Sequence, residues 1–232
     1  MRLGLIGDIH GNDLALEAVL AAARAADADA LLVTGDLVGY YHRAAAVVAL
    51  LDHWPCYIVR GNHEDMLARS RIDAAVLEHV EQKYGSGLRT ALGELASAQL
   101  DRLCSLPHPL ELELGSRRIL LCHGAPWDND CYVYPDAGPD ILQRCAAGAH
   151  DLVVLGHTHH AMIHHIGATT IMNPGSVGQP RDRRPGAAWA LYDTVTGEVS
   201  LRRESYALEP IIAQARSRDP ALPYLTSVLT RT

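Results

Sequence analysis

The 232-residue sequence contains no Phe, no Cys-x-x-C pair and no apolar run long enough to cross a bilayer. Leu, Val, Ile and Ala, helped by Tyr and three Trp, must therefore fill the core. The five Cys are an odd number, and no apolar stretch of signal-peptide length opens the chain. Both observations predict reduced thiols and a cytoplasmic protein without a membrane partner.

Basic residues are also in short supply, with 20 Lys and Arg against 27 Asp and Glu and a formal net charge of −7. Proteins that hold nucleic acid usually show a basic stripe, so this balance argues against a stable nucleic-acid complex. A hydrophobic fraction of 48% with 20% charged residues is typical of a globular protein. No repeat or linker is visible, and the length predicts a single α/β domain over residues 1–232.

Short apolar runs alternate with helical patterns along the first two thirds of the chain, which is the signature of βαβ units. The predicted strands of this part lie at 3–6, 30–33, 56–59, 119–122 and 152–155. The predicted helices lie at 12–28, 44–51 and 139–147, and residues 65–105 are expected to form covering helices or a lid. A hairpin at 161–172, strands at 187–193 and 198–205, and a short helix with an extended end complete the prediction.

Metal-ligating side chains stand next to Gly at the end of each predicted strand. They are Asp8 and His10, then Asp36, then Asn62 and His63, then His123, and finally His157 and His159. Loops at the carboxyl ends of such strands are where open α/β sheets place their ligand sites. Mixed nitrogen and oxygen ligands suit Zn, Mn or Fe, whereas Mg and Ca prefer oxygen alone. The number of ligands exceeds the need of one ion and suits two ions that share a carboxylate.

These blocks together resemble the calcineurin-like metallophosphoesterases. In chain order they read Gly7-Asp8-Ile9-His10, Gly35-Asp36, Gly61-Asn62-His63-Glu64, His123-Gly124 and Gly156-His157-Thr158-His159. The later turn at 173–181, Asn-Pro-Gly-Ser-Val-Gly-Gln-Pro-Arg, resembles the small bacterial and archaeal phosphodiesterase branch. The resemblance implies a four-layer α-β-β-α sandwich of two mixed sheets flanked by helices.

The resemblance also implies a role for each matching residue. Asp8, His10 and His159 would bind a first metal ion, Asn62, His123 and His157 a second, and Asp36 would bridge them. His63 would stay off the metals and act on the substrate, as general acid or as stabiliser of transition-state charge. Two divalent transition-metal ions are implied, with Mn expected first and Zn, Fe, Ni or Mg as alternatives.

The implied reaction is hydrolysis of a phosphodiester by a metal-bound hydroxide. The substrate would be a nucleotide or a similar small phosphorylated molecule. Gly39 and Tyr40 stand where protein Ser/Thr phosphatases carry an Asp and a phosphate-binding Arg, which argues against phosphoprotein substrates. A dinucleoside polyphosphate hydrolase and a phosphomonoesterase stay open as alternatives, as does a non-catalytic metal-binding scaffold.

Three further residues are expected beside the substrate. Arg181 follows a turn whose backbone can face a phosphate, and His42 is expected to line the cleft. Tyr40 can stack on a nucleobase or simply pack in the structure. The sequence leaves a homo-oligomer open.

Overall fold

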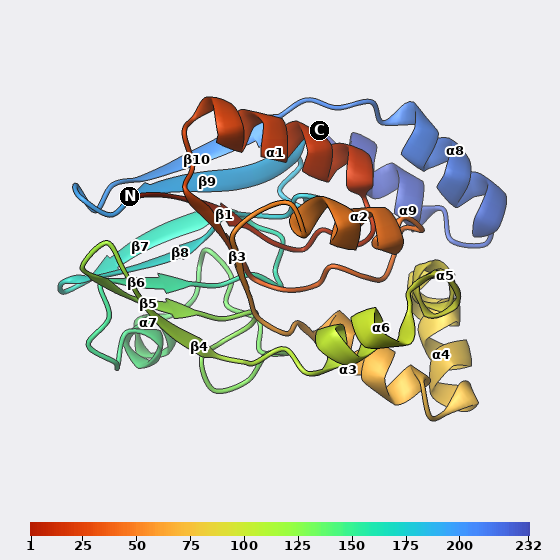
Figure 1. Ribbon diagram of the computed structural model, residues 1–232, viewed down its shortest axis with the longest axis horizontal. Coiled ribbons are helices and arrows are strands. Elements are labelled where there is room, and N and C mark those ends of the chain that lie inside the picture. The colour runs from red at the N-terminus through yellow and green to blue at the C-terminus, as the bar shows by residue number, and fades with distance from the viewer.

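The computed structural model describes residues 1–232 as two five-stranded sheets with helices outside them (Figure 1). The first sheet has the order β10-β9-β1-β2-β3, with bounds Val199–Glu204, Ala187–Asp193, Arg2–Ile6, Ala30–Val33 and Cys56–Ile58. The second has the order β4-β5-β6-β8-β7, with bounds Leu110–Leu114, Arg117–Leu121, Leu152–Val154, Thr169–Asn173 and Met162–Ile166. Both sheets mix parallel and antiparallel pairs, and the predicted fold class is confirmed.

Helices α1 (Asp13–Ala25) and α2 (Ala44–Leu51) make the crossovers between the parallel strands β1, β2 and β3. The helix α1 begins after Asn12, whose side-chain oxygen accepts a hydrogen bond from the Ala15 N–H at 3.2 Å. It ends three residues before the predicted boundary at 28, because Asp27 takes a left-handed backbone with φ of 54°.

Alternation of side chains along the strands divides the core into layers. In β2, Leu31 and Val33 pack against the helices, whereas Leu32 faces the second sheet. In β5, Ile119 and Leu121 face the first sheet, and Leu120 packs in the cluster on the outer side of the second sheet, with Leu142 of α7 (Pro139–Cys145). The central strands β2 and β6 are therefore buried on both faces, which explains why they read as continuous apolar runs.

Residues 65–105 are helical, as predicted. They belong to α3 (Asn62–Ser70), α4 (Ala74–Tyr84), α5 (Gly87–Glu94) and α6 (Ser97–Cys104), which lie beside the carboxyl end of β3 (Figure 1). The end of the chain forms α8 (Glu209–Arg218), α9 (Tyr224–Ser227) and a 3₁₀ turn, Val228–Thr230. None of the helices combines the length and the apolar character that crossing a bilayer requires.

The C-terminal helices hold the loop that follows β2. The Tyr41 hydroxyl donates a hydrogen bond to the Leu225 carbonyl at 2.9 Å, and both side chains are buried in one apolar cluster. His42 lies beside Asp219, with 2.8 Å between Nε2 and a carboxylate oxygen. The segment from α8 to the 3₁₀ turn thus braces the loop between β2 and α2, which carries Asp36.

Glu64 ties the ends of β2 and β3 together from inside. Its carboxylate accepts hydrogen bonds from the backbone N–H groups of Asp36, Leu37 and Gly61, at 2.8, 2.8 and 2.9 Å. The side chain is fully buried. Because three buried backbone donors depend on one side chain, Glu64 fixes the position of the chain at the site described below.

We expect Glu64→Ala to lower the free energy of unfolding by about 3 kcal/mol or more, because three buried donors lose their acceptor. In a chain of this size that corresponds to a melting temperature about 6–12 °C lower, measurable by circular dichroism. Glu64→Gln keeps one acceptor oxygen, so its melting temperature should lie between those of the wild type and Glu64→Ala. The exposed Glu78 on α4 provides the control Glu78→Ala, and an equal effect of the two alanine variants would contradict the bracing role.

Candidate metal centre

The predicted ligands converge from both sheets. Asp8 and His10 follow β1 and Asp36 follows β2, whereas His123 follows β5 in the second sheet. His157 and His159 follow β6 and complete the group from that side. All six are at most 4% exposed, and Asn62, at the start of α3, is 9% exposed. Buried charged and polar side chains in this number need partners, because burial without them is costly.

The ligand atoms form three overlapping groups, each within 4.8 Å. One contains Asp8, His10 and His159, the second His10, Asp36 and His63, and the third Asp36, His123 and His157. His10 and Asp36 each belong to two groups, so the cluster is continuous.

Two imidazole nitrogens face each other in a way that calls for a cation. His10 Nε2 and His159 Nε2 are 3.1 Å apart. The Nδ1 atom of His10 lies 3.1 Å from the Val38 carbonyl, and that of His159 lies 2.6 Å from the Gln179 carbonyl. A carbonyl only accepts, so each Nδ1 carries the hydrogen and each Nε2 presents a lone pair. Facing lone pairs repel, and a cation coordinated by both nitrogens removes that repulsion.

The ring of His123 is oriented in the same way. Its Nδ1 donates to the Thr34 carbonyl at 2.7 Å, which leaves Nε2 directed at the cluster. That Nε2 lies 3.0 Å from Asn62 Oδ1 and 3.2 Å from His157 Nδ1. An amide oxygen and two ring nitrogens are a donor set that suits a transition-metal ion.

Asp36 stands between these two nitrogen sets. Its Oδ2 is 3.6 Å from His10 Nε2 and 3.4 Å from His123 Nε2. The other oxygen accepts a hydrogen bond from the His63 backbone N–H at 2.9 Å. One carboxylate oxygen therefore faces both halves of the cluster, the position from which a carboxylate can bridge two ions.

Burial and neighbouring charges set the protonation of the cluster. Burial holds the pKa of His10 and of His159 well below the usual range and lowers that of His157 to about 3. These three rings are neutral at pH 7, the form that binds a metal ion. His123 differs, because burial lowers its pKa but the charge of Asp36 outweighs this and raises the pKa to about 10. The ring thereby places positive charge against Asp36, where a bound ion can replace its proton.

The backbone at the cluster is left-handed, which sequence patterns do not reveal. Asp8, His10, Asp36, His157 and His159 have φ between 50° and 67°. Residues other than Gly adopt this region at a cost of about 1–3 kcal/mol when the surroundings impose it, and such residues gather at functional sites. The loops therefore hold the ligands in place through a backbone that the fold enforces.

Residues 1–197 match the family model of the calcineurin-like phosphoesterase superfamily domain. The chain belongs to this superfamily. Membership indicates a metal-dependent phosphoesterase, which agrees with the donor set that the cluster offers.

Three relatives of the phosphoesterase cover nearly its whole length. An uncharacterized protein of Methanocaldococcus jannaschii is 27% identical over 229 residues, 89% of this chain and 88% of that protein. A metallophosphoesterase of Sphaerobacter thermophilus is 28% identical, with a TM-score of 0.80 over 100% of this chain and 98% of that one. A hypothetical protein of Pyrococcus horikoshii shares the fold at 19% identity, with a TM-score of 0.86 over 99% and 98% of the two chains.

His63 lies against the cluster but has a different environment from the other imidazoles. Its ring centroid is 4.7 Å from that of His10, and the rings of Tyr40 and Tyr84 lie 4.9 and 5.2 Å away. Its buried Nδ1 has no hydrogen-bond partner. Gly39 leaves the room for this ring, because a Cβ at position 39 would collide with Nδ1. His63 can therefore serve the phosphoesterase as a proton donor or as a ligand, and the geometry allows both.

The three expected substrate residues have different surroundings. Arg181 Nη2 donates to the Tyr40 hydroxyl at 2.9 Å, and Tyr40 packs edge-on against His10 with centroids 4.6 Å apart. Both residues thus lie beside the cluster. His42 Nε2 contacts Asp219, which follows α8, and the Ser86 hydroxyl, which precedes α5. These contacts give His42 an anchoring role, and its expected place in the cleft stays a prediction.

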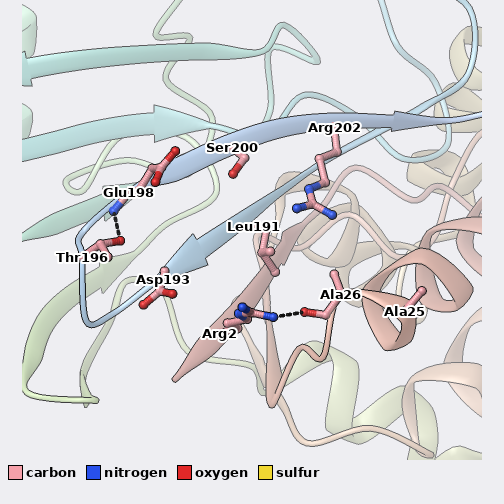
Figure 2. A pocket seen from close by; sticks show the side chains of 9 residues that line it. All are labelled: Arg2, Ala25, Ala26, Leu191, Asp193, Thr196, Glu198, Ser200 and Arg202. Carbon is pink, nitrogen blue, oxygen red and sulfur yellow. Dashed lines mark hydrogen bonds between the residues drawn. The ribbon is translucent and has the colours of Figure 1, made fainter.

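A separate hollow of about 380 Å³ lies at the other end of β1 (Figure 2). Arg2, Asp193, Glu198 and Arg202 are among its lining residues, and Arg2 donates a hydrogen bond to the Ala26 carbonyl at 3.2 Å. Because Arg2 starts β1 and Asp8 follows its end, this hollow takes no part in the metal centre of the phosphoesterase.

Proposed function

We propose that the chain is a two-metal phosphodiesterase for nucleotides or similar small substrates. The observation that carries the proposal is the Asp36 oxygen between His10 Nε2 and His123 Nε2. In this proposal Asp8, His10 and His159 would hold one ion, Asn62, His123 and His157 would hold the other, and Asp36 would serve both. The family resemblance puts Mn first, and the mixed nitrogen and oxygen ligands suit Zn and Fe as well.

Bound divalent ions supply positive charge against the phosphoryl oxygens and lower the pKa of water at the phosphorus atom. The protein orients the ligands through the carbonyls of Val38, Thr34 and Gln179, which fix the imidazole tautomers. His63 is proposed to donate a proton to the leaving oxygen, because its ring lies beside His10 at the edge of the cluster. Burial lowers the pKa of His63 itself, so a bound anionic substrate is what would favour its charged form.

Arg181 is proposed to hold a phosphoryl oxygen of the substrate. The guanidinium donates to Tyr40 and to Gln179 Oε1, yet its buried Nε has no partner. Burial favours loss of its charge, but nearby oxygens outweigh this and raise its pKa above the usual value, so the positive charge is permanent. A charged donor kept in place by Tyr40 suits recognition of an anion.

For Arg181→Ala we expect KM to rise about 10- to 100-fold, since a hydrogen bond from a charged group contributes about 1.5–3 kcal/mol. Metal content should stay unchanged, because Arg181 supplies no ligand. Steady-state kinetics with bis-p-nitrophenyl phosphate and metal analysis of the same sample measure both. The exposed Arg183, two residues away, gives the control Arg183→Ala. A wild-type KM in Arg181→Ala would remove Arg181 from the substrate site.

The test of the proposed function is turnover of bis-p-nitrophenyl phosphate and p-nitrophenyl phosphate after chelation and reloading with Mn, Zn, Ni or Mg. Diester cleavage that returns with metal supports a phosphodiesterase, and faster cleavage of the monoester supports a phosphomonoesterase. If two ions bind but neither compound reacts, a dinucleoside polyphosphate should be tried next. Inactivity towards all three would favour the non-catalytic scaffold.

A further inference from the structure

A cleft of about 700 Å³ lies between the α3–α4 pair and the loop that carries Asp130 and Tyr132. Its apolar lining includes Val76 and Val80 of α4. Neither the family assignment nor the ligand pattern accounts for this cleft, because it contains none of the metal-ligating residues.

Two aromatic residues connect the cleft to the metal centre. Tyr84 lines the cleft, and its ring centroid lies 5.2 Å from that of His63. Tyr132 also lines it, and its ring lies 4.0 Å from that of His157. The cleft is therefore connected to His63 through the Tyr84 ring and to His157 through the Tyr132 ring. Tyr132 remains 48% exposed, so part of its ring is free to pack against a ligand.

The cleft also carries unpaired positive charge. Arg69 and Lys83 line it, and neither forms an ion pair within the chain. Lys83 sits near the metal centre, next to Tyr84, with Nζ 4.8 Å from the Tyr84 ring centre. Arg69 lies six residues along α3 from His63, about 9 Å by the rise of a helix. The one carboxylate of the lining, Asp130, faces His157 Nε2 at 3.4 Å.

We propose that this cleft binds the leaving group of the substrate and that the leaving group is a nucleotide, a nucleoside with a phosphate of its own. The base packs against Tyr84 and Tyr132, and its phosphate meets Arg69 and Lys83. Aromatic stacking tolerates any base, because every base has a π-face. In a chain of net charge −7, two unpaired cations in one cleft favour an anionic ligand. This inference rests on the proposed function.

Lys83 offers a direct readout, because it is the single lysine of the sequence. Reductive methylation with ¹³C-formaldehyde labels its amine and the α-amine of Met1, and keeps both charges. In the metal-loaded protein we expect AMP to shift the Lys83 methyl resonance in a saturable way. The Met1 resonance should stay in place as the internal reference. Ribose 5-phosphate, which lacks the base, should bind about tenfold more weakly than AMP.

Two variants test the residues of the cleft. Tyr132→Ala and Arg69→Ala replace exposed side chains and are each expected to weaken AMP binding about tenfold. Arg71→Ala is the matched control, since Arg71 is paired with Asp101 and does not line the cleft.

Turnover of bis-p-nitrophenyl phosphate in the same samples separates the two proposals. An AMP affinity equal to that of ribose 5-phosphate, or a Lys83 resonance that AMP does not move, overturns the nucleotide cleft even where the diester is cleaved. The other outcome is that the diester is not cleaved, but AMP still shifts the Lys83 resonance and its affinity still falls in Tyr132→Ala and Arg69→Ala. In that case the cleft binds nucleotides and the proposed hydrolysis is wrong.

Discussion

Asp36→Asn is expected to leave the protein folded but to reduce bound metal well below two ions per chain. The amide keeps an oxygen that can accept the hydrogen bond from the His63 N–H, so the local backbone is preserved. It removes the negative charge that faces both His10 and His123. Removing the charged partner of a buried cation costs about 3–5 kcal/mol. Turnover should therefore fall by about 10³-fold at metal concentrations that saturate the wild type.

Metal analysis after gel filtration and kcat for bis-p-nitrophenyl phosphate measure the two effects. The matched control is Asp13→Asn, which changes a buried carboxylate that pairs with Arg43 at 3.2 Å and lies outside the cluster. It should leave metal content and turnover near wild type. Two ions and full turnover in Asp36→Asn would show that this carboxylate bridges nothing.

His63→Asn is expected to retain both ions and to lower kcat by about 10²- to 10⁴-fold, the range for loss of a general acid. The loss should be smaller for bis-p-nitrophenyl phosphate than for a dinucleotide, because p-nitrophenolate leaves readily without a proton and an alkoxide does not. A comparison of the two substrates therefore tests proton donation itself.

The alternative role for His63 is visible in the same experiment. A nitrogen of its ring lies within 4.8 Å of ligand atoms of His10 and Asp36, an arrangement that also suits His63 as a ligand of an ion. Loss of one ion from His63→Asn would establish that role and contradict the assignment as acid. His150→Asn is the control, since His150 is buried beside Glu111, away from the cluster.

Much of the site could be predicted from the sequence, because strand ends fix where ligands lie. The runs that end at Asp8, Asp36 and His123 are buried on both faces, so their boundaries are sharp and their carboxyl ends converge. These runs do not predict that two separate sheets meet around one cluster. Only the family resemblance implied that arrangement.

Other features depend on contacts between residues distant in sequence, and no local pattern announces them. The hydrogen bonds that Asp36 and Leu37 donate to Glu64 join residues 28 and 27 positions apart. The contact of His42 with Asp219 spans 177 residues, so no pattern around His42 could reveal this partner. Tyr84 lies in a helix with an ordinary amphipathic pattern, and only the fold places it against His63.

The ligands come from both sheets, and this affects how readily the protein is degraded in a cell. Any ion held by Asp8 and His159, or by Asn62 and His123, joins two layers that otherwise meet through apolar packing and a few hydrogen bonds. Such an ion binds only the closed arrangement, so it suppresses opening between the layers and protects the chain from proteolysis. The abundance of the protein should then follow the metal supply, with chains that lack metal degraded first.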